Sequence, residues 1–492
     1  MTAVRPLTLD VTDFGPVAGA CVELRPLTVF VGPSNTGKSW LATLVYALHR
    51  YFEASSPRWF PWLRTEIETP ELPEGLEADL RRLADQLAAS FLSAEPPGEG
   101  IALTDPVTTA IRLHLESQGE AVGREIERCF GIDTETEVVR KGSVGCPHVR
   151  IRHVVDPTST PTVQELTFSD EMWTLVAAVP DGMRIRIDRY GLRLNTLLRS
   201  EGEAEGVQPR RTWEAIGALA HDLLLTYHPA FYLSADRGGL VNGLSTVVSA
   251  LLQNAALAGI RRASPLAPLS GVQADFLERL VELVAGQERG SRRGREDLRR
   301  LGKSIEDEIL GGSVKVGGLP GIAYPHFTYH PSGWRVGLPL AQASSMVSEL
   351  APVVLYLRHV VASGDLLIID EPESHLHPAM QVAFIRKIAE IVEAGVRVIL
   401  TTHSEWVLEE LGNVVGRAGL TNRSNAKSDD EPLRPRDVGV WLFVPAEDDS
   451  GSKVREIELD TDTGLYASGF GAVATALHND WVDIASHRGD AE

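Results

Sequence analysis

Three short runs of β-branched and apolar residues are the most regular feature of the chain. They are Leu27–Val31, Leu366–Ile369 and Val398–Leu400. Each run ends at a glycine or a polar residue, which is typical of a strand buried in a parallel sheet and ending at its carboxyl edge. Apolar residues at helical spacing predict neighbouring helices over 40–51, 345–362 and 378–394. The pattern therefore predicts an α/β fold with a mixed or parallel central sheet and flanking helices.

The middle of the chain has a different pattern. Amphipathic helices there are joined to alternating segments, clearest between 137 and 190, that predict antiparallel strands with one polar face. The other expected helices cover 72–91, 106–130, 213–227, 240–258, 271–288, 293–309 and 470–486. The other expected strands cover 7–11, 21–24, 231–233, 313–316, 334–338, 440–444 and 454–459. A polar segment at 416–436 predicts a loop. We expect a head built from 1–52 and 331–412, with a C-terminal part at 413–492. Between the two parts of the head, an inserted helical and antiparallel-β region at 53–330 is expected in part to complete the head and in part to bind a partner.

Bulk composition narrows the class of protein. With 492 residues, 43% hydrophobic and 23% charged, the chain is long enough for two or three units and ordinary for a soluble protein. Three widely spaced cysteines predict no disulfide framework, which fits a reducing cytoplasm, and no segment predicts a secretion signal or a membrane span. A net charge of −20 argues against a surface made mainly for nucleic acid.

A glycine-rich segment between the first strand and the first helix predicts a phosphate-binding loop. In such a loop the glycines let backbone N–H groups face the phosphates, Lys38 reaches the β- and γ-phosphate oxygens, and Ser39 offers a hydroxyl to Mg²⁺. The segment predicts ATP and Mg²⁺ as ligands. The residues assigned to nucleotide binding are Gly32, Pro33, Ser34, Asn35, Thr36, Gly37, Lys38, Ser39 and Trp40.

Two later strand ends supply the remaining chemistry. Asp370 and Glu371 follow a buried strand, and two buried carboxylates need a cation to offset them. We assign Asp370 to Mg²⁺ and Glu371 to the attacking water. His403 ends the next strand and is expected to sense the γ-phosphate. The pair His375 and His377 lacks a third ligand for zinc, so a loop at a subunit contact is the favoured interpretation.

These motifs together resemble ABC-type ATPase heads, the branch that includes structural-maintenance-of-chromosomes, RecF-like and overcoming-lysogenization-defect proteins. The resemblance covers about 1–50 and 330–412, and within the branch it is to ATPases of bacterial defence and toxin operons. It implies an ATP-bound homodimer in which Ser344 and Ser345, at a helix start, contact the γ-phosphate held by the other subunit. The family's Leu-Ser-Gly-Gly-Gln is absent here. Residues 231–237 resemble the family's Pro-Ala-Glu-Arg element, which implies either that Arg237 supports the site or that it forms a plain salt bridge in a turn. Gln164 is a candidate for the glutamine loop.

Three hypotheses for function remain open. The first is an ATP-driven switch for a separately encoded effector, a nuclease or toxin, in anti-phage defence. The second is a RecF-like ATPase that binds DNA through the basic run Arg289–Lys303, a run that more often forms a solvated helix face. The third is a scaffold that ATP stabilises without useful hydrolysis. A nuclease within the same chain is rejected, because Asp460 and Asp462 are predicted to lie in a hairpin turn close to the acidic cluster 447–449.

Overall fold

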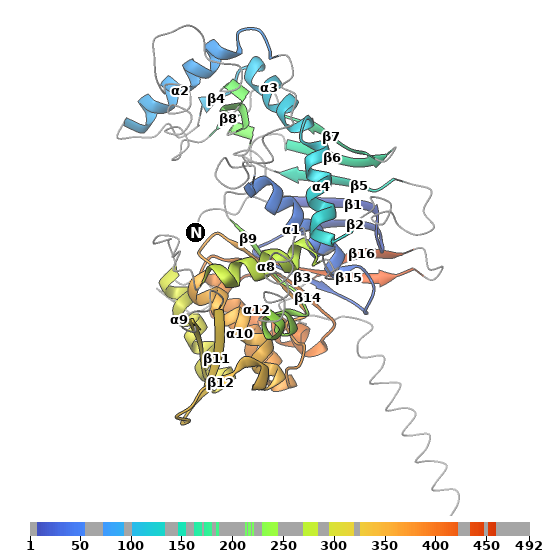
Figure 1. Ribbon diagram of the computed structural model, residues 1–492. Coiled ribbons are helices and arrows are strands. Elements are labelled where there is room, and N and C mark those ends of the chain that lie inside the picture. Colours follow the sequence, from blue (N-terminus) through green and yellow to red (C-terminus); the bar gives the residue numbers. More distant parts are fainter. Residues whose placement is uncertain are drawn as a thin grey trace, which may run out of the picture.

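A computed structural model gives the fold. It describes residues 7–54, 72–92, 101–132, 146–153, 162–169, 172–179, 184–185, 212–213, 215–217, 219–220, 229–244, 269–283, 295–318, 325–421, 433–446 and 451–458. One large mixed sheet runs through the molecule, and helices cover both of its faces (Figure 1). This arrangement confirms the predicted α/β class.

The sheet has eleven strands among the described residues. In spatial order they are β7 (Met172–Ala178), β6 (Thr162–Ser169), β5 (His148–His153), β1 (Leu7–Phe14), β2 (Val17–Leu24), β16 (Ser452–Ile457), β15 (Val438–Pro445), β3 (Leu27–Val31), β14 (Arg397–Thr402), β13 (Leu366–Asp370) and β9 (Ala230–Leu233). The strands from β15 to β9 are parallel to one another, and those from β7 to β2 form an antiparallel half. The three runs expected to be buried strands therefore lie side by side as β3, β14 and β13.

Alternate residues of the parallel strands point into two separate cores. On β13, Leu366 and Ile368 join one hydrophobic cluster, while Leu367 and Ile369 join the other. The first cluster is covered by α1 (Lys38–Ala54), α2 (Leu76–Leu92), α3 (Asp105–Glu116) and α4 (Gly119–Phe130). The second is covered by α8 (Gly271–Glu282), α9 (Arg295–Ile305), α10 (Ser345–His359), α11 (Pro378–Glu393) and α12 (Glu405–Thr421). A strand buried on both faces needs the continuous apolar run that the sequence shows.

Smaller elements complete the described chain. A π-helical turn (Glu306–Leu310) extends α9 and leads into β10 (Gly312–Gly318), β11 (Pro325–Pro331) and β12 (Leu338–Pro339), which form a second sheet. Two 3-10 turns (Leu340–Gln342 and Pro435–Asp437) precede α10 and β15, and β4 (Ile101–Ala102) pairs with β8 (Arg184–Ile185). In Figure 1 the β10–β12 sheet lies near α9 and α10, at the opposite end from α2 and α3.

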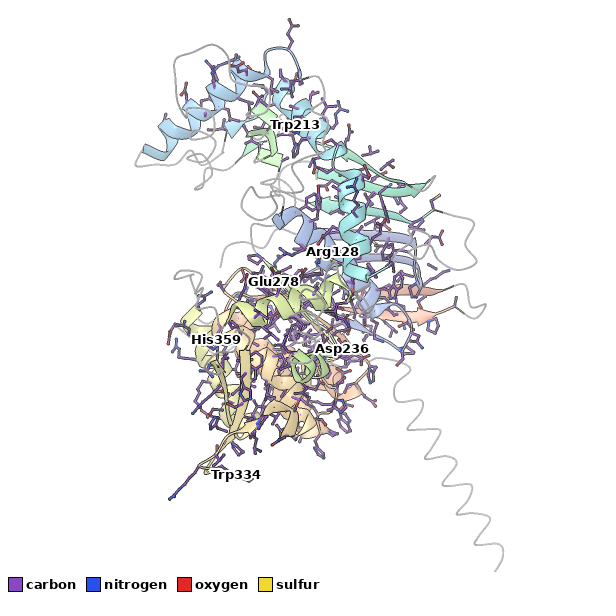
Figure 2. All side chains as sticks on the ribbon, viewed as in Figure 1. Arg128, Trp213, Asp236, Glu278, Trp334 and His359 are labelled. Atoms are coloured by element: carbon purple, nitrogen blue, oxygen red, sulfur yellow. The ribbon has the colours of Figure 1, made fainter. Side chains whose placement is uncertain are left out.

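Several predicted elements need correction. The helix expected at 106–130 is two helices, α3 and α4, that are separated at Ser117 and Gln118. The strand expected at 334–338 is mostly a turn, in which the Trp334 N–H bonds to the Pro331 carbonyl at 3.1 Å. Trp334 projects from the tip of this hairpin (Figure 2). Residues 416–421, which were expected to belong to a loop, form the last part of α12, and residues 422–432 lie outside the described residues.

Other predictions fall on residues that the structure does not describe. These include the helix at 470–486, the turn with Asp460 and Asp462, the acidic cluster 447–449 and the first part of the basic run, 289–294. Most of the helix expected at 240–258 and about half of the one expected at 213–227 also lie outside the described residues. The C-terminal strands that are described, β15 and β16, lie between β3 and β2 in the large sheet. Regions assigned to the insertion and to the C-terminal part therefore contribute strands to the same sheet as the head.

Candidate active site

The glycine-rich loop joins β3 to α1 and needs its two glycines. Gly32 has φ +148° and Gly37 has φ +93°, conformations that residues with a side chain rarely adopt. A Cβ on Gly32 would lie 2.5 Å from the backbone oxygen of Phe443, and one on Gly37 would lie 2.8 Å from Cγ2 of Val17. Residues of β15 and β2 therefore pack so closely against the loop that neither glycine position has room for a side chain. Between the glycines, Pro33, Ser34 and Asn35 are exposed, so this stretch of the loop faces outward.

Gly32→Ala is expected to destabilise the protein by about 1–3 kcal/mol, because the new methyl group meets a carbonyl oxygen in a strained backbone. ATP affinity should fall with it, since the loop backbone must move. Gly19→Ala on β2 is the matched control, because a Cβ there meets nothing within 4 Å. Thermal unfolding and ATP titration of the two variants provide the measurement. Equal behaviour of both would contradict the role given to the loop shape.

Lys38 lies inside the loop rather than on the surface. Its ammonium donates to the carbonyl oxygens of Gly32 at 2.9 Å and Pro33 at 2.7 Å, and only 4% of the residue is exposed. Burial lowers the pKa of Lys38, and the acidic side chains at the end of β13 oppose that shift. A positive charge is thus held at the centre of a loop whose outer residues are exposed, which suits it to an anionic ligand.

Asp370 connects the loop to the end of β13. Its Oδ1 accepts hydrogen bonds from Ser39 Oγ at 2.8 Å, across 331 positions of sequence, and from the hydroxyl of Thr401. Its Oδ2 accepts from the hydroxyl of Tyr232 at 3.3 Å. Burial raises the pKa of Asp370, while the hydroxyl donors of Thr401 and Ser39 oppose that shift. Three hydroxyl groups from three different elements therefore fix this carboxylate.

The donor set suits Mg²⁺ bound together with a phosphate. The hydroxyl oxygen of Ser39 and a carboxylate oxygen of Asp370 are in contact. Both are hard oxygen ligands of the kind that Mg²⁺ prefers. Within the described part of the chain no three histidine, cysteine or acidic residues are arranged to hold a metal by themselves. Mg²⁺ at phosphate sites uses one or two protein oxygens and takes the rest from phosphate and water. The residues present thus fit the ion that the loop predicts.

Glu371 follows Asp370 in an unusual conformation. Its φ is +46°, in the left-handed region, and its N–H donates to both the carbonyl and the hydroxyl oxygen of Thr401 at 3.1 Å. Its side chain is 31% exposed, and Oε1 lies 3.6 Å from Nδ1 of His403. A strained backbone conformation persists where neighbouring groups fix it, and here the two hydrogen bonds to Thr401 do so. The Glu371 carboxylate remains partly exposed to solvent.

His403 lies beside that carboxylate, at the end of β14. Its side chain is 46% exposed, and its Nδ1 is 3.6 Å from oxygens of both Glu371 and Glu373. Because β13 and β14 are parallel neighbours, their ends meet at the same edge of the sheet. The structure therefore brings together Lys38, Ser39, Asp370, Glu371 and His403, as the sequence predicts.

Arg237 connects this edge to α10. It is fully buried, and its guanidinium donates to carbonyl oxygens of Asp370 at 2.7 Å, Ser234 at 3.0 Å and Glu349 at 3.0 Å. A longer contact of 3.5 Å reaches the Glu371 carbonyl. Burial lowers the pKa of Arg237, and the nearby Glu349 carboxylate opposes that shift. The predicted supporting residue is thus a cross-link between the site and a helix that begins at Ser345.

Several residues that the sequence analysis assigned to the site lie outside the group formed by Lys38, Ser39, Asp370, Glu371 and His403. The Trp40 ring packs on Phe130 at 4.7 Å, so its assignment to nucleotide binding rests on its backbone N–H. Ser344 and Ser345 are exposed, and the Ser344 hydroxyl accepts from the N–H of Val347 at the start of α10. They are free to meet a second molecule, as the resemblance implies. Gln164 lies on β6, six strands from β3, which argues against its being the glutamine loop.

His377 and the described part of the basic run have structural partners. His377 caps α11, where its Nδ1 accepts from the N–H of Ala379 at 3.3 Å. His375 is exposed in a left-handed turn. In the described part of the basic run, Arg300 pairs with Asp297, and Lys303 with Asp307 at 2.7 Å. These acids offset the positive charge that the DNA hypothesis needs.

Tyr232, Thr401 and Glu373 are the contributors that the sequence motifs left unassigned. Tyr232 lies on β9, five residues before Arg237, and Thr401 immediately precedes the strand end at Thr402. A hydroxyl group near the end of a buried strand is the available signal for both residues. The carboxylate of Glu373 contacts the end of β14.

Comparison with known families identifies the domain that contains these residues. The family model described as "AAA domain, putative AbiEii toxin, Type IV TA system" matches residues 235–409, which include Arg237, Asp370, Glu371 and His403. This part of the chain therefore matches an AAA domain. The predicted resemblance to an ATPase of this kind is thereby confirmed for residues 235–409, and the glycine-rich loop lies before the matched segment. No curated protein matches the sequence.

Solved structures of similar shape are head domains of SMC proteins. One is an SMC head bound to the C-winged helix domain of ScpA, with 11% identity over 93% of this chain and 99% of that chain and a TM-score of 0.40. Another is the SMC head domain from Thermotoga maritima, with 12% identity over 93% of this chain and 100% of that chain and a TM-score of 0.35. A third is the Pyrococcus furiosus Smc head with an extended coiled coil, bound to the C-terminal domain of ScpA. It has 11% identity over 92% of this chain and 97% of that chain and a TM-score of 0.37. These similarities to the ATPase head are distant.

Proposed function

We propose that this chain binds ATP with Mg²⁺, hydrolyses it, and uses ATP to close two copies of itself into a dimer. The observation that carries the proposal is the 2.8 Å hydrogen bond between Ser39 and Asp370, which joins the glycine-rich loop to the acidic strand end. Glu371 and His403 lie next to that contact. A loop that cradles phosphate, an acid for the metal and an acid for water are the parts that phosphoryl transfer to water requires.

Each residue has a distinct part in the proposed mechanism. Lys38 and the loop N–H groups bind the phosphates, and Ser39 and Asp370 hold the metal. Bound Mg²⁺ would neutralise charge on the β- and γ-phosphates. Glu371, the more exposed of the acids next to His403, orients and deprotonates the attacking water. His403 contacts the γ-phosphate and reports its loss.

The dimer is tested by mixing two inactive variants. Lys38→Ala should remove ATP binding in its own loop, and Ser345→Arg should block the partner's γ-phosphate. In a mixed dimer one composite site keeps both wild-type groups, so an equal mixture should regain roughly a quarter of the wild-type ATPase rate. Each variant alone should stay inactive. If the mixture also stays inactive, the shared site is wrong, whereas activity of Ser345→Arg alone would remove Ser345 from the mechanism.

We further propose that the closed dimer acts on a separately encoded effector, a nuclease or toxin, in the bacterial cytoplasm. The description of the matching family names a toxin and a toxin–antitoxin system, which supports a partner of this kind. None of the described helices is long and apolar enough to cross a membrane. ATP-dependent co-purification with the product of a neighbouring nuclease or toxin gene would support the proposal. Equal recovery with the Lys38→Ala variant would argue against an ATP-controlled partner.

A further inference from the structure

Glu373 is a buried acid at the edge of the ATPase site without an assigned role. It lies three residues after Asp370, in the turn that leaves β13, where its carbonyl accepts from the Leu376 N–H at 2.9 Å. Its side chain is 5% exposed, compared with 31% for Glu371. Burying a carboxylate is costly unless specific donors offset the loss of water. The hydrogen-bond donors around the Glu373 carboxylate therefore indicate its role.

The described hydrogen bonds of its side chain both go to the end of β14. One oxygen, Oε1, accepts from the hydroxyl of Thr402 at 2.7 Å and from the backbone N–H of His403 at 2.8 Å. The same oxygen lies 3.6 Å from Nδ1 of the His403 ring. Its second oxygen, Oε2, is buried and has no hydrogen-bond partner in the described structure. Glu373 thus holds the backbone of His403 by a hydrogen bond and lies beside the Nδ1 side of its ring.

A carboxylate behind an imidazole fixes the ring's orientation. When one ring nitrogen faces an acid, the other is directed away from it and is presented to a reacting group. His403 has acids only on its Nδ1 side among the described contacts, so Nε2 is the nitrogen left to face a ligand. Glu371 is less suited to this task, because its exposed carboxylate is needed for water.

We propose that Glu373 is a positioning residue that sets His403 for contact with the γ-phosphate. The inference rests on the proposed ATPase function, and it adds a residue that does not itself touch the nucleotide. Glu373 belongs to the turn after β13 and accepts hydrogen bonds from the end of β14, so it also connects the ends of the two strands. Removal of Glu373 should therefore act through His403 and not through nucleotide binding.

The test compares Glu373→Ala, Glu373→Gln, His403→Ala and the double Glu373→Ala/His403→Ala variant. Glu373→Ala should lower kcat by roughly 10- to 100-fold, as is typical when a group that orients a ligand is lost, with KM almost unchanged. Glutamine keeps an oxygen at the Oε1 position, so Glu373→Gln should retain most of the wild-type rate. The double variant should be no slower than His403→Ala, because both changes disable the same contact.

A second readout does not depend on activity. In protein labelled with ¹⁵N-histidine, the His403 signals, assigned with His403→Ala, should shift in Glu373→Ala without ATP. Glu306→Ala is the control, because Glu306 is also buried but pairs with Arg358 at 2.9 Å. An unshifted His403 signal, additive losses in the double variant, or a Glu373→Gln enzyme as slow as Glu373→Ala would each overturn the proposal. Absent ATP turnover in the wild type with a shifted His403 signal would instead overturn the ATPase function.

Discussion

Replacing Glu371 by glutamine should lower ATP turnover by about 10²–10⁴-fold, the range that a positioned general base contributes. ATP binding should persist, because Lys38, Ser39 and Asp370 remain in place and the Asp370 carboxylate is fixed by hydroxyl groups rather than by Glu371. Glutamine has the same length, so the left-handed backbone at this position is not further strained. With ATP bound and hydrolysis blocked, the dimer should accumulate, which size-exclusion chromatography with and without ATP would measure.

Lys38→Ala is the matched control for that experiment. It should fail to bind ATP and should therefore remain monomeric at every ATP concentration. Unchanged turnover in Glu371→Gln would contradict the assignment of the base. A cell-based function that survives Glu371→Gln but not Lys38→Ala would favour the scaffold hypothesis, in which ATP binding matters and hydrolysis does not.

The position of the site could be predicted from sequence because its chemistry constrains the spacing. A phosphate loop needs glycines where a Cβ would collide, and at Gly32 that collision is with the backbone of Phe443. Apolar runs that end in polar residues must bring those residues to the same edge, so Asp370 and His403 could be placed together without a contact map. These inferences depend on local sequence and on one rule of parallel sheets.

The partners of those residues could not be predicted in the same way. The burial pattern shows which face of a strand is covered, but it does not show that the hydroxyl of Tyr232 reaches Asp370. Strand order is also absent from the sequence pattern, and so β15 next to β3 was not expected. The left-handed φ of Glu371 depends on tertiary contacts to Thr401, which the residue type does not indicate.

The wrong element predictions have local physical causes. At 334–338 alternating apolar residues suggested a strand, but Ser332 and Gly333 start a turn that leaves Trp334 63% and Val336 70% exposed. The break between α3 and α4 coincides with close packing on β7. A Cβ on Gly119 would lie 2.7 Å from the Leu175 nitrogen, so α4 must begin where the chain can approach that strand. The periodicity of apolar residues in the sequence does not indicate where two backbones, here those of α4 and β7, come close together.

Arg237→Met should lower the free energy of unfolding by about 3–5 kcal/mol, the cost of breaking a buried ion pair from one side. The Glu349 carboxylate, 3.4 Å from Arg237 Nε and 8% exposed, would lose its cation, and the carbonyl oxygens of Asp370 and Ser234 would lose their donor. Burial already raises the pKa of Glu349. Turnover should fall as well, because the backbone that carries Glu371 would no longer be held. Chemical denaturation and the ATPase rate are the measurements.

Two further variants show how much of the effect of Arg237→Met comes from its buried charge and how much from its hydrogen bonds. Arg81→Met removes an exposed ion pair with Glu77, 56% and 42% exposed, and should change stability by no more than about 1 kcal/mol. Arg237→Met/Glu349→Leu removes both buried charges and should recover part of the stability lost in Arg237→Met. It should not recover turnover, because the Asp370 carbonyl still lacks its donor and α10 is still disconnected from the strand end. A single Arg237→Met loss as small as that of Arg81→Met would show that the cross-link does not stabilise the fold, and full activity in the double variant would show that it does not position the site.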